Sequence, residues 1–166
     1  MTATALGWIE PDWPAPAHVR LLSTLRGGGV SEGPFASLNL AGHVGDRAEA
    51  VAANRLLLRE AARLPAEPLW LEQVHGTAVV RHDGAAHAPP RADAAVAFEP
   101  GRVCAVMTAD CLPVVFADRA GTRIGVAHAG WRGLVDGVLQ ATIAALGEAP
   151  AELHVWFGPA IGAAAF

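Results

Sequence analysis

Three short segments each carry one side chain that could bind a soft metal ion. The segments are residues 73–76 (QVHG), 108–111 (TADC) and 127–130 (AHAG). Their candidate ligands are His75, Cys111 and His128. Two imidazoles and a thiolate suit Zn²⁺, which takes nitrogen and sulfur ligands in a tetrahedral shell. Because three protein ligands leave the fourth position open, such a site could make a bound water acidic enough to react near neutral pH.

The spacing of these residues leaves structural roles open. The three side chains lie 36 and 17 residues apart, which matches no known short metal motif. A single histidine after a strand is more often a hydrogen-bonded structural residue, and a single cysteine is more often a small buried hydrophobe. Asp110 beside Cys111 favours an exposed strand end for that thiol, whereas Cys104, inside an apolar run, is expected to pack in the core.

Arg132 and Trp131 follow directly after the third of these segments. Arg132 lies at the start of a predicted helix, where backbone N–H groups and the helix dipole favour an anion such as phosphate. A solvated arginine at a helix start is the alternative. Trp131 could stack on a purine base, although tryptophans fill cores by default.

Strands that could hold these residues are predicted from short apolar runs broken by glycine, proline or aspartate. The predicted strands are residues 18–22, 69–71, 78–81, 94–98, 103–107, 113–116, 124–127 and 153–157. Each segment with a candidate ligand follows an apolar run and precedes a glycine, a proline or a turn. The three side chains could therefore converge at one end of a sheet.

Two helices are predicted from apolar residues that recur every three or four positions. One covers about residues 47–64 and stops at Pro65, and the other follows the turn at 128–133 and ends at Gly147. Asn39 and His43 precede the first helix and are either polar contacts or turn residues, and Asp46 is expected to cap that helix.

Length and composition predict one globular domain. The chain has 166 residues, of which 52% are hydrophobic and 17% charged, so it can bury a core and is not expected to be disordered. Its net charge is −4, which disfavours nucleic-acid binding through a broad cationic face. Together with the order of strands and helices, these features predict an α+β (mixed α/β) fold with a central mixed β-sheet flanked by helices.

The first ten residues have neither a basic region nor a long apolar region, and no apolar run reaches the roughly 20 residues that span a bilayer. We therefore expect a soluble cytoplasmic protein with no membrane partner. In that reducing compartment a disulfide between the two cysteines is not expected.

Several blocks in a fixed order resemble one family of bacterial proteins. The blocks are residues 28–31 (GGVS), 37–40 (SLNL), 43–46 (HVGD), 54–55 (NR), 73–76 (QVHG), 108–113 (TADCLP), 128–133 (HAGWRG) and 158–159 (GP). From residue 24 to 166 the chain is similar to the YfiH-like proteins once called multicopper polyphenol oxidases or laccase-domain proteins, now described as purine nucleoside phosphorylases. The resemblance implies one domain of YfiH-like fold over residues 1–166, C-terminally short relative to the family.

The resemblance also implies one Zn²⁺ per chain, bound by His75, Cys111 and His128. It implies phosphorolysis of adenosine, inosine and methylthioadenosine to free base and ribose 1-phosphate, with an additional adenosine deaminase activity. The partners are then purine nucleosides and inorganic phosphate, and a monomer or homodimer is expected. The residues assigned to catalysis are His43, Asp110, Cys111 and Arg132, and those assigned to substrate or phosphate are Asn39, Arg55, Gln73, Trp131 and Arg132.

Two other activities are known for similar proteins or follow from the older family name. One is an amidase that edits peptidoglycan precursors, with Cys111 as nucleophile and His128 as base. The other is copper oxidation, which the seven scattered histidines disfavour because several copper ions need many paired histidines. A nucleoside-binding module without turnover is the non-enzymatic alternative.

Overall fold

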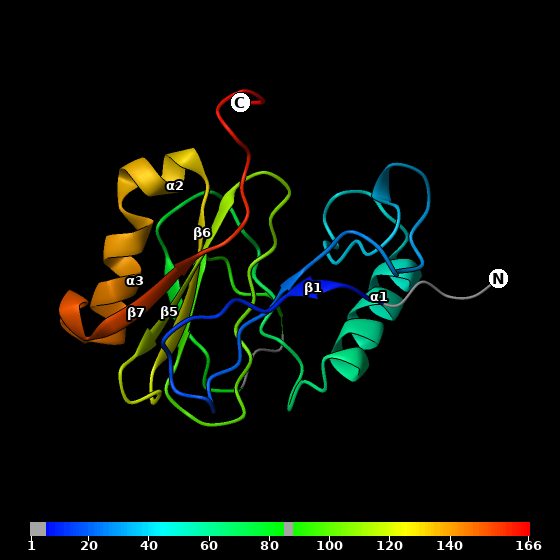
Figure 1. Cartoon of the computed structure of the whole chain (residues 1–166). Coiled ribbons are helices and arrows are strands. Elements are labelled where there is room, and N and C mark those ends of the chain that lie inside the picture. The colour runs from blue at the N-terminus through cyan, green and yellow to red at the C-terminus, as the bar shows by residue number, and fades with distance from the viewer. Residues whose placement is uncertain (1–5, 85–87) are drawn as a thin grey trace. The chain divides into compact units, whose positions relative to one another are not determined.

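The computed structural model describes residues 6–84 and 88–166, which fall into two compact units (Figure 1). The first unit contains the chain up to Asp12 and Leu21–Glu67, and the second contains Trp13–Arg20 and Pro68–Phe166. That the whole chain folds as one domain stays a prediction.

The second unit is built on a five-stranded mixed sheet. Its strands are β3 (Val79–Arg81), β4 (Ala94–Ala97), β5 (Leu112–Asp118), β6 (Ile124–Ala129) and β7 (Leu153–Phe157), in the order β3-β4-β6-β5-β7. The β3–β4 pair is parallel and the other neighbouring pairs are antiparallel. The predicted α+β class with a central mixed sheet is confirmed, and these strands lie close to their expected positions.

Apolar side chains cover both faces of this sheet, because successive strand residues point to opposite faces. Val114 and Phe116 pack on one face with Val138 of helix α3 (Val138–Leu146). Figure 1 shows α3 and helix α2 (Trp131–Asp136) on that same side of the sheet. Val115 belongs to the apolar cluster of the other face.

Segments 69–71 and 103–107 were predicted as strands, and that prediction is wrong. They join only by an isolated parallel bridge between Leu69 and Cys104, and their apolar side chains cover the second face of the sheet. Their hydrophobicity reflects this packing. Cys104 packs against this apolar cluster as expected, and burial raises the pKa of its thiol to about 12.

The predicted second helix is two helices, because the chain breaks at Gly137. Gly137 has a φ of 99°, in the left-handed region that glycine adopts without strain and that interrupts an α-helix. α2 ends there and α3 begins at the next residue. Trp131 and Arg132 therefore lie on the short α2, whereas α3 buries Val138, Thr142 and Leu146.

The first unit contains the antiparallel pair β1 (Trp8–Ile9) and β2 (Ser23–Thr24), the 3₁₀-helix η1 (Gly33–Phe35) and helix α1 (Ala48–Ala61). The helix predicted at 47–64 is thus confirmed with shorter ends. The strand predicted at 18–22 is wrong, because residues 17–19, which belong to the second unit, form a turn in which Val19 N donates to Pro16 O. Within the described residues no helix is long and apolar enough to cross a membrane.

Asp46 does not cap α1 as expected, since Arg47 is the N-cap and makes no side-chain cap bond. The Asp46 carboxylate instead accepts hydrogen bonds from Asn39 Nδ2 at 2.9 Å and from Ser31 Oγ at 2.6 Å. These two bonds lower the pKa of Asp46. The carboxylate therefore ties together loop segments that precede the helix.

The buried side chain of Asn54, in α1, makes hydrogen bonds to the same loop segments. Its side chain is fully buried; its Oδ1 accepts a bond from Val30 N, and its Nδ2 donates to Ser31 Oγ and to the carbonyl oxygens of Ser37 and Asn39. Four of the sequence blocks that carry the family resemblance thus contribute residues to one internal hydrogen-bond network.

The turn between β5 and β6 makes acid stability testable at Asp118. Burial by itself raises the pKa of this carboxyl, but the hydrogen bonds from Arg123 N and from the hydroxyl and N–H of Thr122 outweigh burial, so the pKa lies below its ordinary value. A depressed folded pKa contributes stability above the unfolded value that is lost as pH falls through the folded value. Between about pH 6 and about pH 3, the urea midpoint is expected to fall less in Asp118→Asn than in the wild type. The expectation would be contradicted if the urea midpoint fell equally in Asp118→Asn and in the wild type. It would also be contradicted if the exposed control Asp136→Asn showed a smaller fall than the wild type.

Candidate metal centre

The three side chains singled out by type do come together. The ligand atoms of His75, Cys111 and His128 all lie within 4.8 Å of one another, and Cys111 Sγ is 3.8 Å from His75 Nε2. The two imidazole rings meet edge to face, with ring centroids 4.7 Å apart. His128 is buried, Cys111 is half-buried and His75 is exposed. The cluster is therefore reachable from solvent on one side.

Strand register explains how two of these residues meet. His128 lies within β6, opposite Pro113 of β5, and the next pair is Ala129 with Leu112. Cys111 precedes β5 and so falls beside the end of β6. The sequence pattern predicted that His128 follows its strand, and this is wrong because β6 continues to Ala129. The antiparallel pairing of β6 with β5 therefore holds the backbone of His128.

Asp93, directly before β4, links His128 to the turn that carries His75. Its Oδ1 lies 2.9 Å from His128 Nδ1 and accepts a bond from His75 N at 2.8 Å. Its Oδ2 accepts from Val74 N at 3.1 Å and from Gly76 N at 2.8 Å. His75 has a φ of 60°, an uncommon conformation for a residue with a side chain. The Asp93 carboxylate therefore holds the backbone of the 74–76 turn through three hydrogen bonds.

The Asp93 carboxyl is fully buried. Burial by itself raises its pKa, but the hydrogen bonds from His128 and from the backbone of Gly76, Val74 and His75 together lower the pKa below its ordinary value. The group is therefore an ionised acceptor at neutral pH. It is the buried negative charge of the site.

The Cys111 thiol has the opposite shift. Burial raises its pKa, and the neighbouring Asp110 carboxylate raises it further by its charge and by a hydrogen bond. Without a cation nearby, the thiol form dominates at neutral pH. A bound metal ion reverses this preference because it stabilises the thiolate.

Gly130 has no side chain, and this leaves room for the Cys111 and His75 side chains to approach each other. A Cβ built on this residue would lie 2.9 Å from Cys111 Sγ and 2.9 Å from His75 Cδ2. Its φ of −58° and ψ of 154° are accessible to any residue, so the close approach, and not the backbone, requires glycine here. Gly133 is similar, because its Cβ would lie 2.9 Å from Gly76 O.

We predict that Gly130→Ala lowers the affinity of this cluster for added zinc by at least about tenfold while the protein still folds, because the added methyl displaces two of the candidate ligands. Zinc affinity can be measured by competition with a chromophoric chelator, and folding by circular dichroism. Gly162→Ala is the matched control, since nothing lies within 4 Å of a Cβ at that position. Wild-type zinc affinity in Gly130→Ala would show that the ligands tolerate the methyl group.

Of the other residues predicted in the second unit, Gln73 makes two hydrogen bonds to the backbone of Met107. Its Nε2 donates to Met107 O at 2.8 Å and its Oε1 accepts from Met107 N at 2.7 Å, which ties the His75 turn to the segment before Cys111. Arg132 lies over the Trp131 ring, 4.5 Å from its centroid, and both residues are exposed at the start of α2. Asp110 is exposed beside Cys111.

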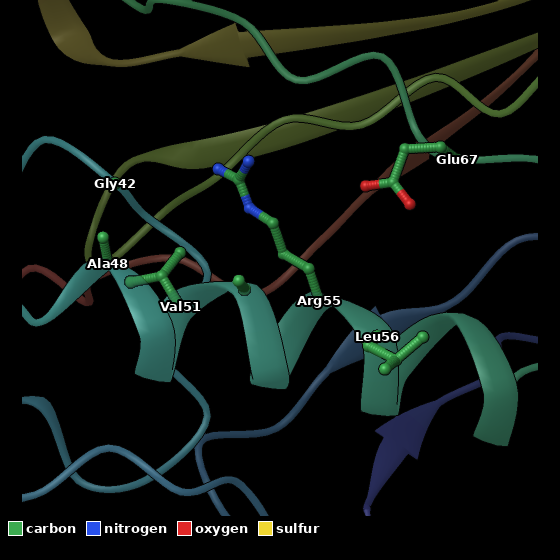
Figure 2. A pocket seen from close by; sticks show the side chains of 7 residues that line it. Gly42, Ala48, Val51, Arg55, Leu56 and Glu67 are labelled. Carbon is green, nitrogen blue, oxygen red and sulfur yellow. The ribbon is translucent and has the colours of Figure 1, made fainter.

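Asn39, His43 and Arg55 belong to the first unit. Asn39 bonds Asp46, and His43 lies exposed in a turn. Arg55 donates from Nε and Nη2 to Leu40 O at 3.0 and 2.8 Å. Its side chain rises from α1 beside an open pocket of about 390 Å³ (Figure 2). The pocket is lined by Gly42, Ala48, Val51, Ala52, Arg55, Leu56 and Glu67. Roles for these residues in substrate binding or catalysis stay predictions.

Sequence reasoning missed Asp93 and Gly130. Asp93 directly precedes a strand of four small apolar residues, and a lone carboxylate in such surroundings needs internal partners. That signal was available, but the partners are distant in the chain. Gly130 was seen only as a turn residue.

Two curated relatives are similar to this chain over most of its length. Purine nucleoside phosphorylase PA4543 of Pseudomonas aeruginosa is 56% identical over 159 residues, covering 96% of this chain and 64% of the relative. Purine nucleoside phosphorylase YfiH of Escherichia coli is 52% identical over 158 residues, covering 95% and 65%. The chain therefore spans about 65% of the length of these relatives.

Solved structures show the same fold. Protein NMB0706 of Neisseria meningitidis matches with a TM-score of 0.90 and 53% identity, covering 96% of this chain and 65% of the other. YlmD of Geobacillus stearothermophilus matches with a TM-score of 0.84 and 35% identity, covering 96% and 64%. The family model described as multi-copper polyphenol oxidoreductase laccase matches residues 20–166, and this chain belongs to that family.

Proposed function

We propose that this chain carries the zinc centre of a purine nucleoside phosphorylase. In this proposal it cleaves adenosine, inosine and methylthioadenosine with phosphate to the free base and ribose 1-phosphate or its methylthio form, and it also deaminates adenosine. The main support is the convergence of His75, Cys111 and His128 in a chain 56% identical to a protein named purine nucleoside phosphorylase.

The donor set fits zinc. Bond lengths of about 2.0–2.1 Å to nitrogen and about 2.3 Å to sulfur place the two ligand atoms of a tetrahedral site about 3.6 Å apart. Cys111 Sγ and His75 Nε2 are 3.8 Å apart. In the part of the chain that the structure describes, this is the one His, Cys, Asp or Glu group arranged to hold a metal. A single nitrogen and sulfur site favours one zinc ion over a cluster of copper ions.

Zinc in this site supplies a Lewis acid and an acidic water. The protein must also hold an anion beside the sugar C1′ and protonate the departing purine. Arg132 is proposed to bind phosphate, and the Trp131 ring beneath it is proposed to orient the guanidinium or to stack on the base. Asp110, exposed beside Cys111, is proposed to move the proton.

The test is a product assay on the purified, zinc-loaded chain. Adenosine, inosine and methylthioadenosine are each incubated with and without inorganic phosphate, and the bases and sugar phosphates are separated by chromatography. We expect base release that depends on phosphate, with ribose 1-phosphate in equal amount. Release without phosphate would indicate a hydrolase. Nucleoside binding by calorimetry with no product would indicate a binding module.

A cysteine amidase is the second candidate, and one observation favours it. His128 is oriented by the buried Asp93 within a cluster that contains a thiol, an arrangement used by cysteine nucleophiles. The raised pKa of Cys111 argues against a free thiolate. Stoichiometric zinc that protects Cys111 from alkylation would exclude the amidase, whereas a metal-free, rapidly alkylated Cys111 would support it.

A further inference from the structure

Asp93 contacts two of the three proposed metal ligands at once. Its carboxylate has four hydrogen-bond partners: the N–H groups of Val74, His75 and Gly76, and His128 Nδ1. All four partners act as donors when His128 carries its proton on Nδ1. An ionised carboxylate suits this arrangement because it is an acceptor only, with room for about four hydrogen bonds.

We infer that Asp93 is the positioning residue of the metal centre, which holds the His128 ring with Nε2 left for the metal and holds the His75 turn in its left-handed conformation. The inference rests on the metal of the proposed function and goes beyond it, because it names the group that prearranges the ligands. Partners of this kind fix the tautomer and orientation of a ligating imidazole.

The side chain of asparagine has nearly the same shape as that of aspartate but only one acceptor oxygen. In Asp93→Asn the amide oxygen can serve at most two of the four donors, and the NH₂ group must face the others. If NH₂ faces His128 Nδ1, the imidazole proton moves to Nε2, where it blocks the metal. If NH₂ faces the 74–76 turn, the N–H groups of Val74 and Gly76 lose their acceptor. Either arrangement disturbs a ligand.

Asp118 provides a matched control in the same unit. It is also buried, and it also accepts backbone and side-chain hydrogen bonds within a turn, from Thr122 and Arg123. It is the last residue of β5, whereas Cys111 precedes the first, so the turn lies at the opposite end of the strand from the ligands. Asp118→Asn therefore reports what the loss of a buried turn carboxylate does without touching the site.

The experiment measures zinc affinity of the full chain by chelator competition in wild type, Asp93→Asn and Asp118→Asn, with urea unfolding of each. We expect zinc to bind about 10–100-fold more weakly in Asp93→Asn and within about twofold of wild type in Asp118→Asn. Equal affinity in wild type and Asp93→Asn overturns the inference and leaves the proposed function standing. A wild-type protein that binds no zinc overturns both. An equal loss in Asp118→Asn also overturns the inference, because general destabilisation then explains the effect.

A second measurement needs no variant and decides the matter if Asp93→Asn does not fold. Nitrogen-15 NMR of the metal-free wild type, at about pH 8 where an ordinary imidazole is neutral, reports which nitrogen of His128 carries the proton. A proton on Nδ1 with a bare Nε2 supports the inference. A proton on Nε2 overturns it.

Discussion

Cys111→Ala is expected to reduce phosphate-dependent base release by about 1,000-fold or to background, because a catalytic metal contributes several kcal/mol to the transition state and each 1.4 kcal/mol is about tenfold in rate. The variant removes the sulfur ligand, leaving two imidazoles. Zinc measured by atomic spectroscopy after dialysis should fall from about one equivalent to a small fraction. Because Cys111 is only half-buried, the fold should remain intact.

Cys104→Ala is the control for this experiment. Cys104 packs among the apolar residues of the second sheet face and takes no part in the metal cluster. Its substitution should lower stability slightly and leave zinc content and turnover per folded molecule unchanged. Turnover that survives in Cys111→Ala after its zinc has been lost would show that the metal centre takes no part in the reaction.

Asn54→Ala is expected to lower the free energy of unfolding of the first unit by about 3 kcal/mol, since buried groups left without partners cost about 1–3 kcal/mol each. The variant leaves the Val30 N–H without the acceptor that Asn54 provides, and three groups lose a donor. Urea unfolding followed by circular dichroism measures the change. The loops that carry Asn39 and Asp46 should loosen together.

Leu56→Ala is the matched control on the same helix, because Leu56 is 47% exposed and alanine preserves the helix. Its expected cost is below about 1 kcal/mol. Should Asn54→Ala cost no more than Leu56→Ala, the buried network would not be what holds these loops, and the shared sequence blocks around it would need another explanation.

Elements with a strong local pattern were predictable from sequence. Helix α1, predicted from its periodicity, and strands β4, β5 and β7, predicted from their apolar runs, lie close to their expected positions. The two predicted strands at 69–71 and 103–107 were wrong because apolar residues pack equally well in a covering layer without strand pairing. The break at Gly137 was missed because the apolar spacing continues through it.

The candidate metal-binding side chains could be singled out from sequence because imidazole and thiolate groups are few and chemically distinctive. Their supporting residues were less predictable. The role of Asp93 depends on the register that places it beside His128, and the role of Gly130 depends on a contact between three separate segments. Such relations exist only after the chain has folded. Asp46 failed as a predicted cap for the same reason, since loop residues compete for its carboxylate.

The three proposed ligands differ in how firmly strand pairing holds their backbone, and this difference affects how a metal ion would exchange. His128 lies within a central strand whose neighbours pair with it on both sides, whereas Cys111 and His75 lie just outside strands. Local opening of either of these segments requires less free energy than unfolding the sheet, because it leaves the strand pairing intact. Exchange of the ion should therefore run much faster than global unfolding, and amide hydrogen exchange should quicken on metal removal at residues 74–76 and 110–111 while that of β6 stays slow.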